Sequence, residues 1–307
     1  MRNCIGRLLA AATAFMLLTA GCARAGSTAA AERPVDGNRK VLNVVTSFYP
    51  VYIATINVTR GIPGVEVTNM TKPGTGCLHD YVLKPEDLKI VGEADVFIIN
   101  GAGMETFLDD VIKQQKNIKI IEASEGIPLL EDENGEENPH VWVSVANMID
   151  YVDNIAQQLS AADPENAGLY DENARMYKAR LEKLREEMHK TLGNLKSRDI
   201  VTFHEAFSYL AKEFNLNVIA AVEGEHGSEP TPKELSGVIE TIRENGIKAV
   251  FTDSQHLSGA VETIARETGA TVYALDLAVS GETSPEACDE YIEAMRRNMS
   301  TLLEALG

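Results

Sequence analysis

Three histidines, His79, His140 and His204, stand in segments that could each present a metal ligand. They lie in Pro-Gly-Thr-Gly-Cys-Leu-His-Asp-Tyr, Asn-Pro-His-Val-Trp and Val-Thr-Phe-His-Glu-Ala-Phe, and the chain of 307 residues has only 6 histidines. Imidazole is the commonest metal ligand in proteins and suits zinc well. Roughly 60 residues separate each of them from the next, whereas a zinc finger takes its ligands from one short segment. Three histidines so far apart in the sequence can bind the same metal ion only if a large fold brings them together. Their spacing therefore predicts a site between structural units.

The other histidines have different settings. His189 lies among Arg185, Glu186 and Lys190 and is typical of a solvated helix face. His226 lies in an acidic loop, where it is either an auxiliary metal-binding residue or a surface residue. His256 follows Asp-Ser-Gln near the end of a predicted strand and is the strongest rival for a ligand role.

The first residues are typical of an export signal. Arg2 and Arg7 precede a short apolar run, Leu8–Leu18, which is too short for a membrane anchor but suits the apolar part of a signal peptide. Leu-Thr-Ala-Gly-Cys follows and resembles a bacterial lipoprotein processing site. We therefore expect a signal peptide over residues 1–21, lipidation at Cys22 and a flexible tether over 22–39, with ordinary secretion as the alternative.

Cysteine usage and charge narrow the possibilities further. Cys77 and Cys288 could form one disulfide or remain two separate thiols, and the sequence leaves both open. A thiolate ligand at Cys77 is the less favoured interpretation, because a lone thiolate in a histidine site needs its own support. The formal net charge of −18 argues against nucleic acid as a partner, since that needs a basic face.

Strand-like and helical segments alternate along both halves of the chain, which predicts parallel βαβ units. The expected helices are 84–91, 104–115, 205–214, 233–245 and 259–268, with Gly246 and Gly269 as helix stops. The expected strands are Val41–Thr46, Val65–Met70, Ala94–Asn100, Ile118–Glu122, Asp199–Phe203, Asn217–Val222, Lys248–Thr252 and Thr271–Leu275.

One long amphipathic helix is predicted between the halves. Apolar residues from Tyr170 to Leu192 recur at spacings of three and four, which places them on one face. The sequence thus predicts an α/β fold of two lobes, 40–163 and 196–307, each with a mostly parallel sheet and joined by a long helix over 164–195.

The parallel sheets also indicate where a site lies, because ligands bind outside the carboxyl ends of such strands. His204 directly follows one predicted strand and Asp276 directly follows another. His79 and His140 lie in loops after strands of the first half, and Ser144 is placed to cap the helix that follows His140. We therefore expect the candidates of the two lobes to face each other across a cleft.

Four motifs together resemble the metal-binding receptors of zinc and manganese ABC importers. The first is Pro-Gly-Thr-Gly-Cys-Leu-His-Asp-Tyr with the later Ala-Asp-Val-Phe-Ile-Ile-Asn-Gly-Ala-Gly-Met-Glu. The others are Asn-Pro-His-Val-Trp-Val-Ser, Phe-His-Glu-Ala-Phe-Ser-Tyr-Leu and Ser-Glu-Pro-Thr-Pro-Lys-Glu-Leu. Their order and separation agree with that family from about residue 41 to the C-terminus, which implies two lobes joined by a rather rigid long helix with one metal in the cleft.

The resemblance implies a ligand set of His79, His140, His204 and Asp276, with Glu282 as the alternative to Asp276. Members that resemble manganese receptors have a carboxylate at the third position, where this chain has His204. Three imidazoles and one carboxylate suit tetrahedral zinc, whereas manganese prefers more oxygen ligands and a higher coordination number. The acidic loop Glu131–Glu137 contains no histidine, unlike the His-rich loop of many zinc receptors.

The sequence therefore predicts a monomeric, lipid-anchored receptor at the outer face of the cell membrane. It would bind Zn²⁺ and deliver it to an ABC permease, without being an enzyme. One alternative is a manganese receptor of the same fold. A second is a secreted zinc hydrolase with three histidine ligands, a bound water and Glu205 as base, although no compact zinc-hydrolase motif is present.

Overall fold

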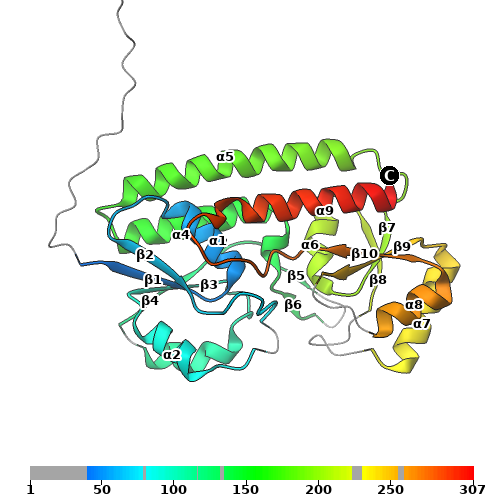
Figure 1. The fold of residues 1–307 in the computed structure, drawn as a ribbon, viewed down its shortest axis with the longest axis horizontal. Coiled ribbons are helices and arrows are strands. Elements are labelled where there is room, and N and C mark those ends of the chain that lie inside the picture. Colours follow the sequence, from blue (N-terminus) through cyan, green and yellow to red (C-terminus); the bar gives the residue numbers. More distant parts are fainter. Residues whose placement is uncertain (1–39, 79–80, 116, 132–134, 223–229, 255–258) are drawn as a thin grey trace, which may run out of the picture. The chain divides into compact units, whose positions relative to one another are not determined.

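The computed structural model describes residues 40–307 except 79–80, 116, 132–134, 223–229 and 255–258 (Figure 1). The predicted signal peptide, lipidation site and tether lie outside the described residues, as do His79, His226 and His256. Among the described residues no helix combines the length and apolar character needed to cross a membrane.

The first sheet is parallel throughout, with strand order β2-β1-β3-β4. Its strands are β1 (Leu42–Thr46), β2 (Val65–Asn69), β3 (Val96–Ile99) and β4 (Lys119–Glu122). The helices between them are α1 (Tyr49–Val58), α2 (Pro85–Gly92) and α3 (Asp109–Gln114), the last preceded by the 3₁₀ turn η1 (Thr106–Leu108). The single helix expected over 104–115 is therefore a 3₁₀ turn followed by a short α-helix.

The second sheet repeats this plan, with parallel strands in the order β10-β9-β7-β8. Its strands are β7 (Asp199–Thr202), β8 (Asn217–Ala221), β9 (Ala249–Asp253) and β10 (Thr271–Leu275). Its helices are α6 (Ser208–Glu213), α7 (Pro232–Asn245), α8 (Gly259–Thr268) and α9 (Glu290–Leu306). All eight predicted strands are confirmed to within two residues at each end. Gly246 ends α7 in the left-handed conformation, as predicted.

Two antiparallel helices connect the sheets. Ser144 caps α4 (Val145–Ala162) by accepting a hydrogen bond from the backbone N–H of Asn147, which confirms the predicted cap. The long helix is α5 (Ala167–Leu192), and its predicted apolar face from Tyr170 to Leu192 is buried throughout. Its 26 residues span about 39 Å. It packs on α1, α4 and α9, so elements of both lobes lie against it (Figure 1).

One hydrophobic core is common to both lobes. It contains Val44 and Ile98 of the first sheet, Phe251 and Leu275 of the second, and Leu181 of α5. The opposite face of each sheet has its own cluster, under α2 and α3 in the first lobe and under α7 and α8 in the second. Residues Asn38–Gly307 accordingly form one compact unit. The exact boundaries between lobes stay predictions.

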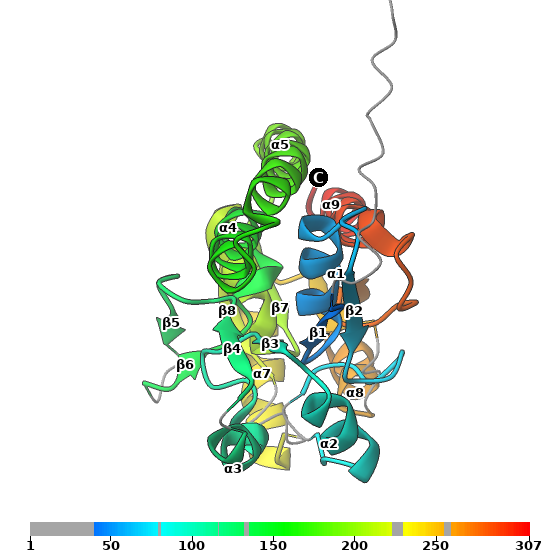
Figure 2. The same ribbon diagram turned by 90° about the vertical axis from the view of Figure 1, so that its left-hand side faces the viewer.

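Two short pairs of elements complete the site region. The strands β5 (Leu130–Glu131) and β6 (Glu137–Asn138) form an antiparallel hairpin, which lies between the two sheets in Figure 1 and to one side of their strands in Figure 2. The 3₁₀ turns η2 (Val141–Val143) and η3 (Glu205–Phe207) begin directly after His140 and His204. The helix expected over 205–214 therefore begins as a 3₁₀ turn, and a last such turn, η5 (Ala287–Asp289), precedes α9.

Candidate metal centre

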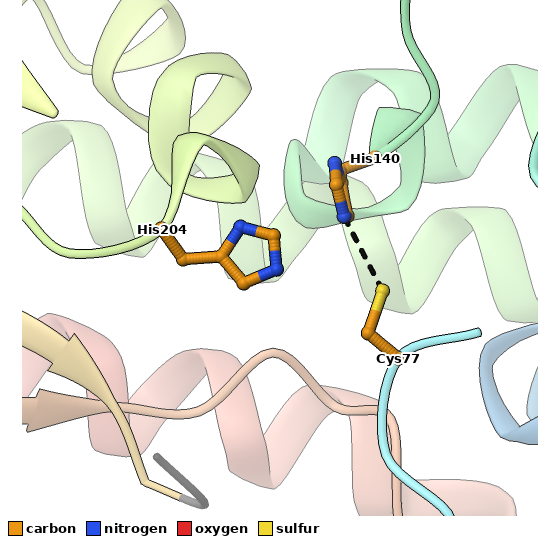
Figure 3. A group of neighbouring side chains, drawn as sticks. All are labelled: Cys77, His140 and His204. Atoms are coloured by element: carbon orange, nitrogen blue, oxygen red, sulfur yellow. Dashed lines mark hydrogen bonds between the residues drawn. The ribbon is translucent and has the colours of Figure 1, made fainter. Parts of the chain in front are cut away.

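Three side chains from distant segments form a group that could hold a metal ion. Cys77, His140 and His204 each offer a ligand atom, and these atoms lie within 4.8 Å of one another (Figure 3). Cys77 lies in the loop after β2, His140 between β6 and η2, and His204 directly after β7. The group thus joins the two lobes, as predicted for His140 and His204, and it includes a cysteine that sequence reasoning ranked low.

His140 is completely buried and its ring is fixed by Asn138. The Asn138 side-chain oxygen accepts hydrogen bonds from the His140 backbone N–H at 3.0 Å and from ring Nδ1 at 2.8 Å. Because a carboxamide oxygen only accepts, Nδ1 carries the proton and Nε2 presents its lone pair. That is the tautomer a metal needs at Nε2.

The Nε2 lone pair of His140 faces the thiol of Cys77, with Sγ 3.3 Å from Nε2. Since Nε2 is the acceptor, the thiol donates. The Cys77 loop is held on both sides: Gly76 before it has φ +78°, a conformation that favours glycine, and Leu78 after it is fully buried in the common core. The thiol therefore points at His140 because its backbone is fixed.

His204 belongs to the second lobe and is held differently. It is 5% exposed, and its ring lies edge-on to the His140 ring with centroids 4.8 Å apart. Its Nδ1 accepts a hydrogen bond from the backbone N–H of Ala206 at 3.1 Å, which caps η3. A nitrogen that accepts is unprotonated, so the neutral ring carries its proton on Nε2.

Asn138 connects the two halves of the group. Besides fixing His140, its amide donates to the backbone oxygen of Glu205 at 3.1 Å, directly after His204. Its own backbone oxygen accepts a hydrogen bond from Tyr209 at 2.7 Å. Sequence reasoning gave Asn138 no role, although an asparagine side chain commonly accepts a hydrogen bond from the backbone N–H two residues further along the chain, here that of His140.

A buried carboxyl supports the His140 loop from beneath. Glu105 accepts hydrogen bonds from the Ser47 hydroxyl and from the backbone N–H groups of Asn100 and Gly101. The Asn100 amide in turn donates to the backbone oxygen of Pro139, the residue before His140. Burial raises the pKa of Glu105 to about 7, against the lowering effect of these three donors. The Asn-Gly-Ala-Gly-Met-Glu motif therefore positions the loop.

Asp276 does not belong to the group of metal-binding side chains among the described residues. One carboxylate oxygen forms an ion pair with Arg297 at 2.7 Å, and the other accepts from the Ala278 backbone N–H at 2.8 Å. Its loop nevertheless adjoins the site, because the Trp142 indole donates to the backbone oxygen of Leu277 at 2.9 Å. The alternative, Glu282, is also absent from the described group. The ligand roles of Asp276 and of His79 stay predictions.

No disulfide joins Cys77 and Cys288, so the disulfide alternative is wrong. Cys288 is buried and its thiol donates to the backbone oxygen of Pro285 at 3.0 Å. Burial raises the pKa of this thiol. The two cysteines thus have separate surroundings: Cys288 fills the core, whereas Cys77 lies beside the rings of His140 and His204.

Comparison with known proteins assigns the chain to a family. The model of the family described as "Zinc-uptake complex component A periplasmic" matches residues 44–305. Among curated proteins, the zinc-binding protein AdcA of Streptococcus pyogenes is 31% identical over 290 residues, covering 85% of this chain and 55% of AdcA. This chain therefore spans about half the length of AdcA.

The match with this chain covers nearly the whole length of two further relatives. The high-affinity zinc uptake system protein ZnuA of Bacillus subtilis is 28% identical over 95% of each chain. Among solved structures, the SBP FpvC of Pseudomonas aeruginosa with Ni²⁺ has a TM-score of 0.79 and 34% identity, covering 87% of this chain and 97% of FpvC. FpvC was also solved with Mn²⁺. The two-lobe fold with its long helix is thus the fold of metal-binding receptors.

Proposed function

The chain belongs to the family of zinc-uptake complex component A, and from that premise we propose that it is an extracytoplasmic zinc receptor. It binds Zn²⁺ between its lobes and delivers it to the membrane permease of an ABC importer. Zinc is the cargo, and the receptor carries out no chemical reaction on it. The observation that carries the proposal is the convergence of His140 and His204, from different lobes, on one small volume.

The proposed ligands include the three histidines. His140 and His204 are buried, and His79 follows the Cys77 loop by two residues. Each carboxylate oxygen of Asp276 already accepts one hydrogen bond, from Arg297 and from the Ala278 backbone, and these two contacts fix how the carboxylate is oriented. Its proposed role as a ligand therefore includes a reorientation of the carboxylate, whereas the His140 ring is already held with Nε2 toward the group.

Zinc is the favoured metal because the described donors are nitrogen and sulfur, which suit zinc, whereas manganese prefers oxygen. The manganese receptor is the second candidate, since FpvC of the same fold was solved with Mn²⁺. We also propose that Cys22 carries the lipid that holds the receptor at the outer face of the membrane, and that the receptor is a monomer.

Calorimetric titration of the chelator-treated protein tests the proposal. Wild type should bind one Zn²⁺, and His140→Ala or His204→Ala should weaken binding by about 100-fold or more, because loss of partners outside the first ligand shell already costs 10–100-fold. His189→Ala is the matched control, since its ring lies on α5 beside Phe214 and Glu213, away from the group. It should leave zinc affinity unchanged.

Two outcomes would overturn the proposal. In the first, His140→Ala and His204→Ala both bind zinc with an affinity within twofold of wild type. The other is Mn²⁺ displacing Zn²⁺ when the two compete at equal concentration, which would identify a manganese receptor instead.

A further inference from the structure

We infer that the Cys77 thiolate is a zinc ligand and takes the coordination position that the sequence predicted for Asp276. This inference rests on the proposed function, because it concerns the same site, and it names the class of metal that the site selects. A cation that accepts sulfur, such as Zn²⁺, Co²⁺ or Cd²⁺, is favoured over Mn²⁺, which prefers oxygen.

The first argument is distance. In a tetrahedral zinc site with Zn–S of about 2.3 Å and Zn–N of about 2.0–2.1 Å, sulfur and nitrogen ligands lie about 3.6 Å apart. Sγ of Cys77 and Nε2 of His140 are 3.3 Å apart. The pair therefore already has nearly the separation that a shared zinc ion requires, and a shift of a few tenths of an ångström completes it.

The second argument is direction. Asn138 holds the His140 ring so that its Nε2 lone pair faces Cys77, and the thiol proton lies between the two atoms. When zinc binds there, the thiol proton leaves to solvent, and the sulfur and nitrogen lone pairs form the two metal bonds. This hydrogen bond thus keeps both proposed ligand atoms aimed at the place that the metal would take.

The third argument is the contrast with the carboxylate it would replace. Asp276 is oriented by Arg297 and by the Ala278 backbone, and it does not belong to the group of donors found among the described residues. Cys77 already directs its thiol at the His140 ring, so the contact that zinc would displace there joins two of the proposed ligands. Of the two candidates, Cys77 is therefore the one whose donor atom already faces another donor of the group.

Cobalt is the probe that separates the two possibilities, because Co²⁺ bound to a thiolate has an intense sulfur-to-metal charge-transfer absorption in the near ultraviolet. Metal-free wild type, Cys77→Ser and Cys288→Ser are titrated with Co²⁺. Cys288→Ser is the matched control, since Cys288 is the other cysteine among the described residues. We expect the band in wild type and Cys288→Ser, and Co²⁺ binding without the band in Cys77→Ser.

Competition between metals gives the second measurement. Cys77→Ser should lose at least about tenfold in zinc affinity and less than twofold in manganese affinity, so that the preference for zinc falls. The inference is overturned if wild-type Co²⁺ protein lacks the band, if the band survives in Cys77→Ser, or if zinc and manganese affinities fall equally. If wild type binds Co²⁺ or Zn²⁺ but its Co²⁺ form lacks the band, the proposed receptor function still stands and only the ligand role of Cys77 is wrong. If wild type binds neither metal, both the ligand role and the receptor function are wrong.

Discussion

The two halves of the metal centre are prepared to different degrees. In the first lobe, Cys77 and His140 lie nearly at the separation of two zinc ligands, and the His140 tautomer already presents a lone pair. In the second lobe, the Nδ1 of His204 is used by the Ala206 backbone N–H. Zinc at either ring nitrogen of His204 requires this hydrogen bond to break, because a neutral ring has only one lone pair to give.

This difference suggests two steps in zinc binding: first contact with the first lobe, and then ligation by the second lobe. Under the proposed function, the first lobe would bind the metal ion with little rearrangement and would make the first contact with zinc. The second lobe would add its imidazole only after exchanging an internal hydrogen bond, which costs about 0.5–1.5 kcal/mol. Release of the cargo would then be helped, because the Ala206 hydrogen bond re-forms when His204 dissociates from the metal.

The largest expected effect tests what holds the first half rigid. The pKa of Glu105 is raised to about 7 by burial, so folding favours its protonated form. Below the unfolded pKa of about 4.3, Glu105 makes its full contribution to the free energy of unfolding. As the pH rises from there through about 7, this contribution is lost, and the free energy of unfolding falls by up to about 3 kcal/mol. Glu105→Gln stays neutral, so the unfolding free energy of the variant should fall less over this range.

Urea unfolding of the metal-free protein at several pH values measures this difference. Glu66→Gln, on the exposed face of β2, is the control and should follow wild type at every pH. The amide of Gln meets the Gly101 N–H, which adds a cost independent of pH. Parallel pH curves for wild type and Glu105→Gln would therefore disprove the supporting role of the carboxyl.

The second-largest expected effect concerns Asn138, which connects the His140 side of the metal centre to the His204 side. Asn138→Ala removes the acceptor that fixes His140 and the donor to the Glu205 backbone. Zinc affinity should fall 10–100-fold, the range for residues that orient a metal ligand. Asn138→Asp keeps the acceptor for His140 but loses the donor, so it should recover most of the affinity. Calorimetry measures both variants.

Asn217→Ala is the control for Asn138→Ala, because it removes an exposed asparagine of the second lobe that bonds Asp199. Equal losses in Asn138→Ala and Asn138→Asp would mean that the link to Glu205, and not the His140 tautomer, governs affinity. The two halves would then be less independent than the geometry indicates.

The fold was largely predictable because its signals are local and periodic. The apolar face of α5 and the eight short strands repeat at the spacings of a helix and of buried strands. Helix α1 was not predicted, since all ten of its residues are buried and no polar face marks it as a helix.

The site was predictable only in part. Position after a strand indicated His204, and the motifs indicated His140, but which side chain completes the group depends on contacts that no spacing reveals. Asp276 follows β10 as predicted, yet Arg297, on the following helix, binds its carboxylate. Cys77 was ranked low because its support, the Asn138-oriented imidazole, comes from another segment.

The smallest expected effect is a change of histidine tautomer, and it tests directly whether the two halves of the metal centre differ before zinc binds. Long-range proton–nitrogen spectra of the metal-free protein should show His140 with its proton on Nδ1 and His204 with its proton on Nε2, as their hydrogen bonds require. On zinc binding through Nε2, His204 should change tautomer and the Ala206 amide signal should shift, while His140 keeps its form. Single substitutions of each histidine assign the signals, and His189 should not respond. If His204 already carries its proton on Nδ1 without metal, both halves are equally prepared and closure costs no hydrogen bond.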